Sequence, residues 1–346
     1  MSAITTKSIP YGLPGGPTPW SLGEEEGIAH IKAAYDAGIN TFDTANVYSN
    51  GLSEVILGKA IKKHNLNRDE IVVMTKVFFT VGHTPEAKDT PESGGYVNQR
   101  GLSRKHIFES VAHSLRRLQL DYVDVLQCHW FDDNTPIEET MRALHDVVQA
   151  GHARYIGMSS CYAWQFHMMQ NYAITNGLTL FISMQNHYCM LYREEEVRSP
   201  FLFLRSLHQL IQIRSQREMM PTLKHFGVGS IPWSPLARGI LTRPLAQAST
   251  SKRQDTDPIL GMYLKNPKDR EIVGRLEEVA ARIGASMAQT ALAWLMAKDG
   301  VTAPIVGTTS LANLQDLLGA VNITLEEEDI KYLDELYEPR ASLMGK

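Results

Sequence analysis

Four side chains in the amino-terminal half of the sequence have the types and spacing needed to protonate a carbonyl group. Asp43 ends the apolar run INTFD, Tyr48 follows five residues later, Lys76 ends IVVMTK and His129 ends VDVLQCH. A lysine paired with an aspartate stabilises a nearby phenolate, which lowers the pKa of the phenol from its usual value near 10. Tyr48 would then donate a proton to a carbonyl oxygen, and a neutral His129 would donate a hydrogen bond to the same oxygen.

Each of the four residues also has a purely structural interpretation. Asp43 can cap the loop after its strand, Tyr48 can be a rim aromatic, Lys76 can be solvated and His129 can be a hydrogen-bonded core histidine. Three of them nevertheless end apolar runs, and the phenol lies on the loop between two of those runs. The combination favours a catalytic unit.

The elements that must position these residues form a regular alternation of short apolar runs and helix-period segments, which is typical of repeated βα units and a parallel sheet. Predicted strands cover 39–43, 71–77, 122–129, 153–159, 180–187, 227–233 and 302–306. Predicted helices include 24–37, 53–63, 103–118, 135–151 and 162–176, with Ser53 and Ser103 expected to cap the second and third of them. The sequences SMAQ at 286–289 and TLEE at 324–327 predict capping boxes. We therefore expect residues 1–346 to form a single α/β domain, a (β/α)8 TIM barrel with catalytic groups at the carboxyl ends of its strands.

The first strand departs from a regular barrel. The eighth strand must come from 4–9, which predicts an irregular or incomplete first strand because YGLPGGPTPW follows it. A doubly wound sheet is the alternative, but it needs a Gly-rich phosphate turn and the chain has no GxGxxG.

Composition excludes several other classes of protein. Lys and Arg total 34 against 38 Asp and Glu, a net charge of -4, so no basic field is available for nucleic acid. No apolar window is long enough to span a membrane, and the start MSAITTK lacks a signal core. The scattered Cys128, Cys161 and Cys189 predict neither disulfides nor a metal site, and they suit a cytoplasmic location.

From about Trp20 to Arg340 the sequence resembles the aldo-keto reductase family of NAD(P)H-dependent barrel oxidoreductases. GINTFDTANVYSNGLSE resembles the segment that carries the aspartate and tyrosine, VVMTK the lysine strand and DYVDVLQCHWFD the histidine strand. YIGMSS, SMQNHY, IPWSPLARG and PIVGTTSLANLQ resemble the cofactor-side segments in the correct order. Within the family, NVYSNG, GYVNQRGLSR and LYREEE are most similar to fungal aryl-alcohol-dehydrogenase-like members.

The resemblance implies hydride transfer from a nicotinamide to an aldehyde or ketone, with Tyr48 as general acid, Lys76 and Asp43 tuning it and His129 orienting the carbonyl. It also implies a cofactor-binding set in which Asp43 participates. The carboxamide would be held by Ser159, Ser160 and Gln185, and the nicotinamide ring would stack on Trp233. The pyrophosphate would be bound by Ser234, Pro235, Leu236, Ala237, Arg238 and Gly239. The adenosine phosphate would be bound by Gly307, Thr308, Thr309, Ser310 and Gln315. NADP is the expected cofactor, because members of the family usually use it. NAD is not excluded, because the chain has Gly307, Asn313 and Gln315 where many members place an Arg or Lys.

The expected substrate is an aromatic or bulky apolar small-molecule carbonyl, in a setting such as fungal secondary metabolism. Aromatic residues near the predicted mouth would wall its pocket: Trp20, Phe78, Phe79, Trp130 and Phe131. Trp130 replaces an Arg common in close relatives, which would exchange a charged contact for an apolar one. The loop 81–100 would either order over the site or join a subunit contact, in a monomer or a homodimer.

The segment 197–216, VRSPFLFLRSLHQLIQIRSQ, interrupts a stretch that the family writes continuously from YREEE to REMMP. It has no acidic residue, and its twenty codons can begin with GT and end with AG. We hypothesise a translated, unspliced intron. The alternative is an amphipathic lid helix, since Leu204, Leu207, Leu210 and Ile211 share one helical face.

Two other functions compete with a carbonyl reductase. One is a cofactor-binding regulatory barrel, and the other is an inactive product that the atypical insertion has disrupted.

Overall fold

The computed structural model describes residues 6–8, 21–84, 95–196, 218–250, 257 and 260–340. They belong to two compact units. The sheet unit comprises residues 4–185 and 307–311, and the helical unit comprises 1–3, 186–306 and 312–346. The expectations for Trp20 and for 197–216 concern residues outside those described, and so does the expectation for the loop 81–100 over residues 85–94.

The sheet unit contains six parallel strands whose order in the sheet follows their order in the chain. They are β1 (Thr6–Ser8), β2 (Thr41–Asp43), β3 (Val72–Val77), β4 (Val123–Cys128), β5 (Ala153–Ser159) and β6 (Phe181–Gln185). Five of them lie within or coincide with the strands predicted at 39–43, 71–77, 122–129, 153–159 and 180–187, and β1 lies within 4–9. β1 pairs with β2 through Lys7 opposite Phe42 and Ser8 opposite Asp43.

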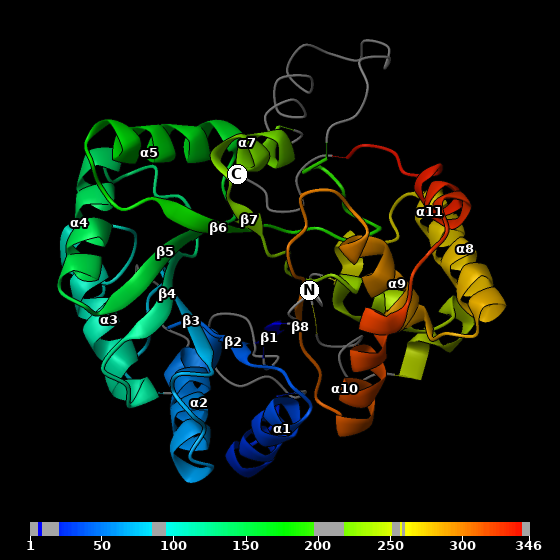
Figure 1. The fold of residues 1–346 in the computed structure, drawn as a ribbon, viewed down its shortest axis with the longest axis horizontal. Coiled ribbons are helices and arrows are strands. Elements are labelled where there is room, and N and C mark those ends of the chain that lie inside the picture. The colour runs from blue at the N-terminus through cyan, green and yellow to red at the C-terminus, as the bar shows by residue number, and fades with distance from the viewer. Residues whose placement is uncertain are drawn as a thin grey trace. The chain divides into compact units, whose positions relative to one another are not determined.

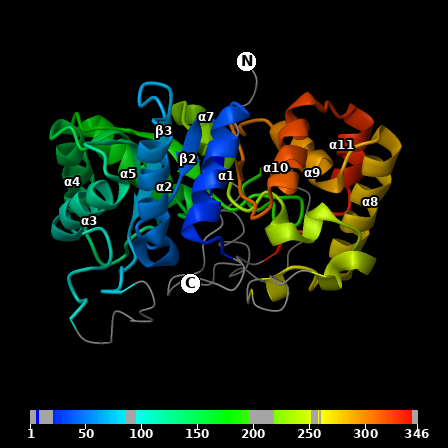
Figure 2. The ribbon, with the colours of Figure 1, turned by 90° about the horizontal axis from the view of Figure 1, so that it is seen from below.

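Five helices connect these strands: α1 (Glu24–Asp36), α2 (Leu52–Lys63), α3 (Arg104–Leu118), α4 (Ile137–Gln149) and α5 (Ala163–Thr175). Figure 1 shows α2 to α5 on the convex side of the curved strands β3 to β6, as in half of a barrel. Each helix buries an apolar stripe, as Ile107, Val111 and Leu118 of α3 do. The helices α1 and α2 pack against each other and run side by side in Figure 2.

The helical unit holds two very short strands, β7 (Gly229–Ser230) and β8 (Ile305–Val306), both shorter than predicted. Its helices are α7 (Met219–Phe226), α8 (Pro267–Ile283), α9 (Met287–Met296) and α11 (Glu327–Asp334), and α10 (Leu311–Leu318) begins at its boundary. Short 3-10 segments complete it: η2 (Ala237–Thr242), η3 (Leu245–Thr250), η4 (Leu260–Met262) and η5 (Gly319–Asn322). The apolar core between α8 and α9 includes Val273, Leu276, Leu295 and Trp294.

Of the four predicted helix caps, two are confirmed and two are wrong. Ser103 caps α3 by accepting from the backbone N–H of His106, and Ser286 forms a capping box with Gln289, as predicted. The cap predicted at Ser53 is wrong, because α2 begins one residue earlier and the Ser53 hydroxyl instead contacts that of Thr44. The capping box at Thr324 is also wrong, since α11 begins after Glu326.

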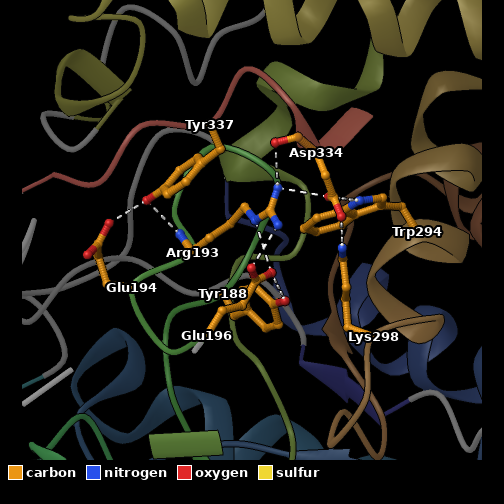
Figure 3. Close-up of polar contacts among 8 residues, drawn as sticks. All are labelled: Tyr188, Arg193, Glu194, Glu196, Trp294, Lys298, Asp334 and Tyr337. Carbon is orange, nitrogen blue, oxygen red and sulfur yellow. Dashed lines mark hydrogen bonds and ion pairs between the residues drawn. The ribbon is translucent and has the colours of Figure 1, made fainter. Parts of the chain in front are cut away.

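A buried polar network ties the YREEE segment to α9 and to the chain after α11 (Figure 3). The Arg193 guanidinium is paired with Glu196 at 2.7 Å and with Asp334 at 2.8 Å. The backbone N–H of Arg193 donates to the Tyr337 hydroxyl at 2.8 Å, and this hydroxyl donates to Glu194 at 2.7 Å. Removing one member of such a buried charge network leaves its partner unpaired at low dielectric, so the network specifies the position of 193–196.

The described residues therefore form an α/β fold with a parallel half-barrel of strands and outer helices. Among the helices of the described ranges, none has the length and apolarity that a membrane crossing requires.

Candidate active site

The ends of β2 and β3 place Asp43 and Lys76 together in the interior of the sheet unit. Successive side chains of a strand point to opposite faces, and Thr75 faces outward, donating to Glu54 of α2 at 2.5 Å. Lys76 consequently faces inward, where its side chain is fully buried. Its ammonium group lies 2.5 Å from Oδ2 of Asp43 and donates to the carbonyl oxygen of Thr44 at 2.9 Å.

Asp43 is held by two amide side chains in addition to the lysine. Its Oδ1 accepts from Nε2 of Gln127 at 2.9 Å and from Nε2 of Gln185 at 3.0 Å. A buried carboxylate with three donors is compensated and fixed in orientation. Gln127 was not predicted as a site residue. Its signal in the sequence is its position two residues before His129 on β4, which places both side chains on the same face.

The electrostatics of this cluster keep Lys76 charged. Burial opposes the ammonium form, but attraction to Asp43 and Tyr48, together with side-chain hydrogen bonds to both, raises the pKa of Lys76 above its ordinary value. The cluster thus supplies a fixed positive charge beside a phenol.

Tyr48 lies on the 3-10 turn η1 (Tyr48–Gly51) directly after β2. Its ring centroid is 5.0 Å from the ammonium of Lys76 and 5.6 Å from that of His129, with the tyrosine and histidine rings edge to face. Ser49 and Asn50 have left-handed φ values of 45° and 55°. Non-glycine residues in this region carry strain that the surroundings must maintain, and here it turns the chain sharply after Tyr48.

His129 follows β4 and lies beside Tyr48. Burial, and to a lesser degree the charge of Lys76, lowers the pKa of His129 well below its ordinary value. The ring is therefore neutral at physiological pH, with one nitrogen available as a donor. Its Nδ1 is buried and has no hydrogen-bond partner within the described part of the chain.

Aromatic side chains extend from His129, and we call Phe78, Phe79 and Trp130 the aromatic wall. The Phe79 ring lies 5.1 Å from His129 and 5.2 Å from Trp130, and Phe78 lies 5.1 Å from Phe79. Phe131, predicted in the same set, turns instead toward Trp164 of α5, at 6.3 Å.

Predicted cofactor residues of the sheet unit occur at two places. Ser159 ends β5 and its hydroxyl donates to the Gln185 carbonyl oxygen at 2.7 Å, while Ser160 has a left-handed φ of 51°. Before α10, the backbone N–H of Ser310 donates to the Thr308 hydroxyl at 3.2 Å, within the predicted segment Gly307, Thr308, Thr309, Ser310.

The remaining cofactor residues lie in the helical unit. Trp233 stacks on His187 at 4.3 Å, and His187 stacks on Tyr192 at 4.4 Å on its other side. The histidine was missed from the sequence. In the sequence SMQNH, His187 lies two residues after Gln185, a predicted site residue, and this spacing was the available signal. It gave no reason to expect that the histidine ring stacks on other rings. Gln315 is exposed on α10.

The segment Ser234, Pro235, Leu236, Ala237, Arg238, Gly239 has the features of an anion site. Ser234, Ala237, Arg238 and Gly239 all have positive φ, and the backbone N–H groups of Ala237 and Gly239 donate to the carbonyl oxygens of Ser234 at 3.0 Å and Leu236 at 2.9 Å. The Nε of Arg238 is buried and lacks a hydrogen-bond partner among the described residues, although Nη1 pairs with Asp257 at 2.6 Å. These groups fit the pyrophosphate of a dinucleotide.

The structure thus brings Asp43, Tyr48, Lys76 and His129 into one cluster within the sheet unit, beside the aromatic wall. The Trp233 stack and the turn at 234–239 belong to the helical unit.

Comparison with known proteins adds independent findings. The family model described as the aldo/keto reductase family matches residues 11–338. The chain is 42% identical to the versiconal hemiacetal acetate reductase of Aspergillus parasiticus, over 100% of this chain and 96% of the relative. It is 44% identical to a putative aryl-alcohol dehydrogenase of Schizosaccharomyces pombe, over 92% of this chain and 94% of the relative. An aldo-keto reductase of Fusarium vanettenii is 43% identical, over 93% of this chain and 84% of the relative.

Proposed function

Because the chain belongs to the aldo/keto reductase family of oxidoreductases, we propose that it reduces an aromatic or bulky apolar aldehyde or ketone with NADPH. The observation that carries this proposal is the buried Lys76–Asp43 pair beside Tyr48 and a neutral His129. The proposal includes the family's (β/α)8 barrel over residues 1–346, a cytoplasmic location and a monomeric or homodimeric state.

In the proposed reaction, the carbonyl oxygen of the substrate binds between Tyr48 and His129. A bound reduced nicotinamide supplies a hydride to the carbonyl carbon. As negative charge develops on the oxygen, Tyr48 donates its hydroxyl proton to it, and the carbonyl becomes an alcohol. Lys76 stabilises the resulting phenolate electrostatically, and neutral His129 stabilises the oxygen with a hydrogen bond.

Asp43, Gln127 and Gln185 keep the lysine charged and in place. Without the carboxylate, burial alone would favour a neutral amine, which cannot stabilise a phenolate. We therefore assign Asp43 the role of fixing the lysine charge and orientation.

For the cofactor, we propose that Ser159, Ser160 and Gln185 hold the carboxamide and that Trp233 contacts the nicotinamide ring. The turn from Ser234 to Gly239 would bind the pyrophosphate through backbone N–H groups and Arg238. Gly307, Thr308, Thr309, Ser310 and Gln315 would bind the adenosine phosphate. NADPH is proposed over NADH, and comparison of kcat/KM for the two cofactors tests that choice.

The first prediction concerns the general acid. With NADPH and 4-nitrobenzaldehyde, Tyr48→Phe should lower kcat by about 10²- to 10⁴-fold, because the proton donor is lost while the ring remains. Stopped-flow absorbance of NADPH measures the rate, and NADPH fluorescence measures cofactor affinity, which should change little.

The matched control is Tyr35→Phe, which removes an exposed hydroxyl hydrogen-bonded to Glu70. This variant should retain full activity. Unchanged turnover in Tyr48→Phe would contradict the proposed acid, and absence of NADPH binding in the wild type would contradict the reductase itself.

A further inference from the structure

The exposed side chain of Arg100 adjoins the aromatic wall of the proposed substrate site. The guanidinium carbon of Arg100 lies 5.4 Å from the Phe78 ring centroid and 5.4 Å from that of Phe79. Phe79 in turn contacts His129, so one phenyl ring separates the cation from the proposed carbonyl site. Among the described residues, no acidic side chain forms an ion pair with Arg100.

The backbone that carries Arg100 is held firmly beside this wall. The next N–H, that of Gly101, donates to the Phe78 carbonyl oxygen at 2.8 Å, and the Gly101 carbonyl oxygen lies 2.8 Å from Nδ1 of His106. Gly101 has a φ of 86°, and a Cβ there would lie 2.3 Å from the Asp132 carboxylate. Only glycine fits such a position, which closes the backbone against Asp132.

The nearby carboxylate of Asp132 is occupied by other donors. It accepts from the backbone N–H of Leu102 at 2.7 Å, from that of Asn134 at 3.0 Å and from the Thr135 hydroxyl at 2.6 Å. It thus anchors the segment that follows Arg100 without neutralising the guanidinium.

We propose that Arg100 is a specificity-determining residue that binds a carboxylate on the aromatic ring of the substrate, so that the preferred substrates are carboxyl-substituted aromatic aldehydes. This inference rests on the proposed reductase function. A guanidinium that lies over aromatic rings keeps its N–H edge available, and its planar fork matches a carboxylate in a bidentate pair. The ring of a benzaldehyde would pack along Phe79 and Trp130, with the aldehyde at His129 and the carboxylate at Arg100.

Two substrates of nearly equal shape test the charge. 4-Carboxybenzaldehyde carries the carboxylate, whereas methyl 4-formylbenzoate is its neutral ester. In Arg100→Gln, kcat/KM for the acid should fall about fivefold through KM, the size expected of a partly solvated charge pair, and kcat/KM for the ester should change less than about twofold. Arg100→Lys should recover part of the loss, because it restores the charge without the planar fork.

The matched control is Arg104→Gln, in the same stretch of chain. Arg104 also lies over a phenyl ring, that of Phe108, but it is paired with Asp146 at 2.5 Å. This variant should leave both substrates unaffected. Equal losses for acid and ester in Arg100→Gln, or no loss for either, would overturn the proposal.

A binding measurement separates this proposal from the reductase function. The alcohol 4-(hydroxymethyl)benzoate can be titrated calorimetrically into the NADPH-loaded protein without turnover, because a reduced nicotinamide cannot accept a hydride from the alcohol. Weaker binding in Arg100→Gln than in the wild type and Arg104→Gln supports the carboxylate contact even if Tyr48→Phe contradicts the catalytic assignment. Equal binding in all three proteins would overturn the carboxylate contact even if the ester is reduced.

Discussion

At the scale of single residues, the site depends on two side chains, Lys76 and His129, whose pKa values in the folded protein differ from their ordinary values. Lys76 stays protonated because Asp43 and Tyr48 outweigh the effect of burial, and His129 stays neutral because burial and the charge of Lys76 both lower its pKa. Glu195, near the start of the atypical segment 197–216, also has a shifted pKa. Burial first, and the charge of Glu194 second, raise the pKa of Glu195 to about 8, although Asn186 donates to it at 2.7 Å.

Glu195 gives a prediction for stability against pH. Between the ordinary glutamate pKa and about 8, the folded protein holds a proton that the unfolded chain has released, so the free energy of unfolding falls as pH rises. Glu195→Gln mimics the protonated carboxyl and should remove this slope, which is at most about 1.4 kcal/mol per pH unit. Urea unfolding at about pH 6 and about pH 8 measures it.

The wild type should lose more stability than Glu195→Gln between these two pH values. Exposed Glu277→Gln is the control and should follow the wild type. Parallel pH profiles for wild type and Glu195→Gln would show that the glutamate is ionised in the folded state.

At the scale of elements, close helix packing sets the frame of the sheet unit. Gly58 of α2 faces the end of α3, where a Cβ would lie 2.4 Å from the Leu118 carbonyl oxygen and 2.8 Å from that of Arg117. Backbone cannot yield as a flexible side chain does, so this position requires glycine. On the same α2–α3 contact, Arg117 pairs with Glu54 at 2.7 Å.

Gly58→Ala should therefore reduce the free energy of unfolding by about 1–3 kcal/mol, the usual effect of overpacking. Gly274→Ala provides the matched control, because this helical glycine of α8 has nothing within 4 Å of an added Cβ. That variant should gain about 0.5–1 kcal/mol from helix propensity. Urea unfolding of both proteins tests the pair, and a neutral Gly58→Ala would contradict the packing argument.

At the scale of the whole molecule, a backbone hydrogen bond connects the residues that precede 197–216 to those that follow it. The backbone N–H of Met220 donates to the Glu195 carbonyl oxygen at 3.3 Å. Without the twenty residues, Glu196 would connect directly to Arg217, and this hydrogen bond would join two residues five positions apart at the start of α7. Such a connection would need none of the residues 197–216, which supports the hypothesis of a translated intron.

Deletion of 197–216 should therefore leave the folded protein intact. We expect an equal or higher Tm and at least equal NADPH-dependent turnover, because a shorter connection costs less entropy to close. Calorimetry and the 4-nitrobenzaldehyde assay measure both, with a variant carrying a twenty-residue Gly/Ser segment in place of 197–216 as the control.

Sequencing of the spliced transcript tests the origin of the segment directly. The main message should join the codons of Glu196 and Arg217. A main message that encodes all twenty residues would contradict the intron hypothesis, and a loss of activity on deletion would favour the lid helix.

The sequence by itself determined the elements and the residues at their ends. The positions of β2 to β6, the Ser103 cap and the Ser286 capping box follow from apolar periodicity and from side chains that bond backbone within three residues, and such signals are local. Asp43, Lys76 and His129 were predictable because parallel strands bring their carboxyl ends to one edge of the sheet.

Only the tertiary structure decided what surrounds those residues. Gln127 and Gln185 reach Asp43 from 84 and 142 residues away, and His187 stacks between Tyr192 and Trp233. The charge of Lys76 and the neutrality of His129 depend on burial and on partners from other strands. No local pattern carries such information, because electrostatic energies depend on distances through space that the fold alone sets.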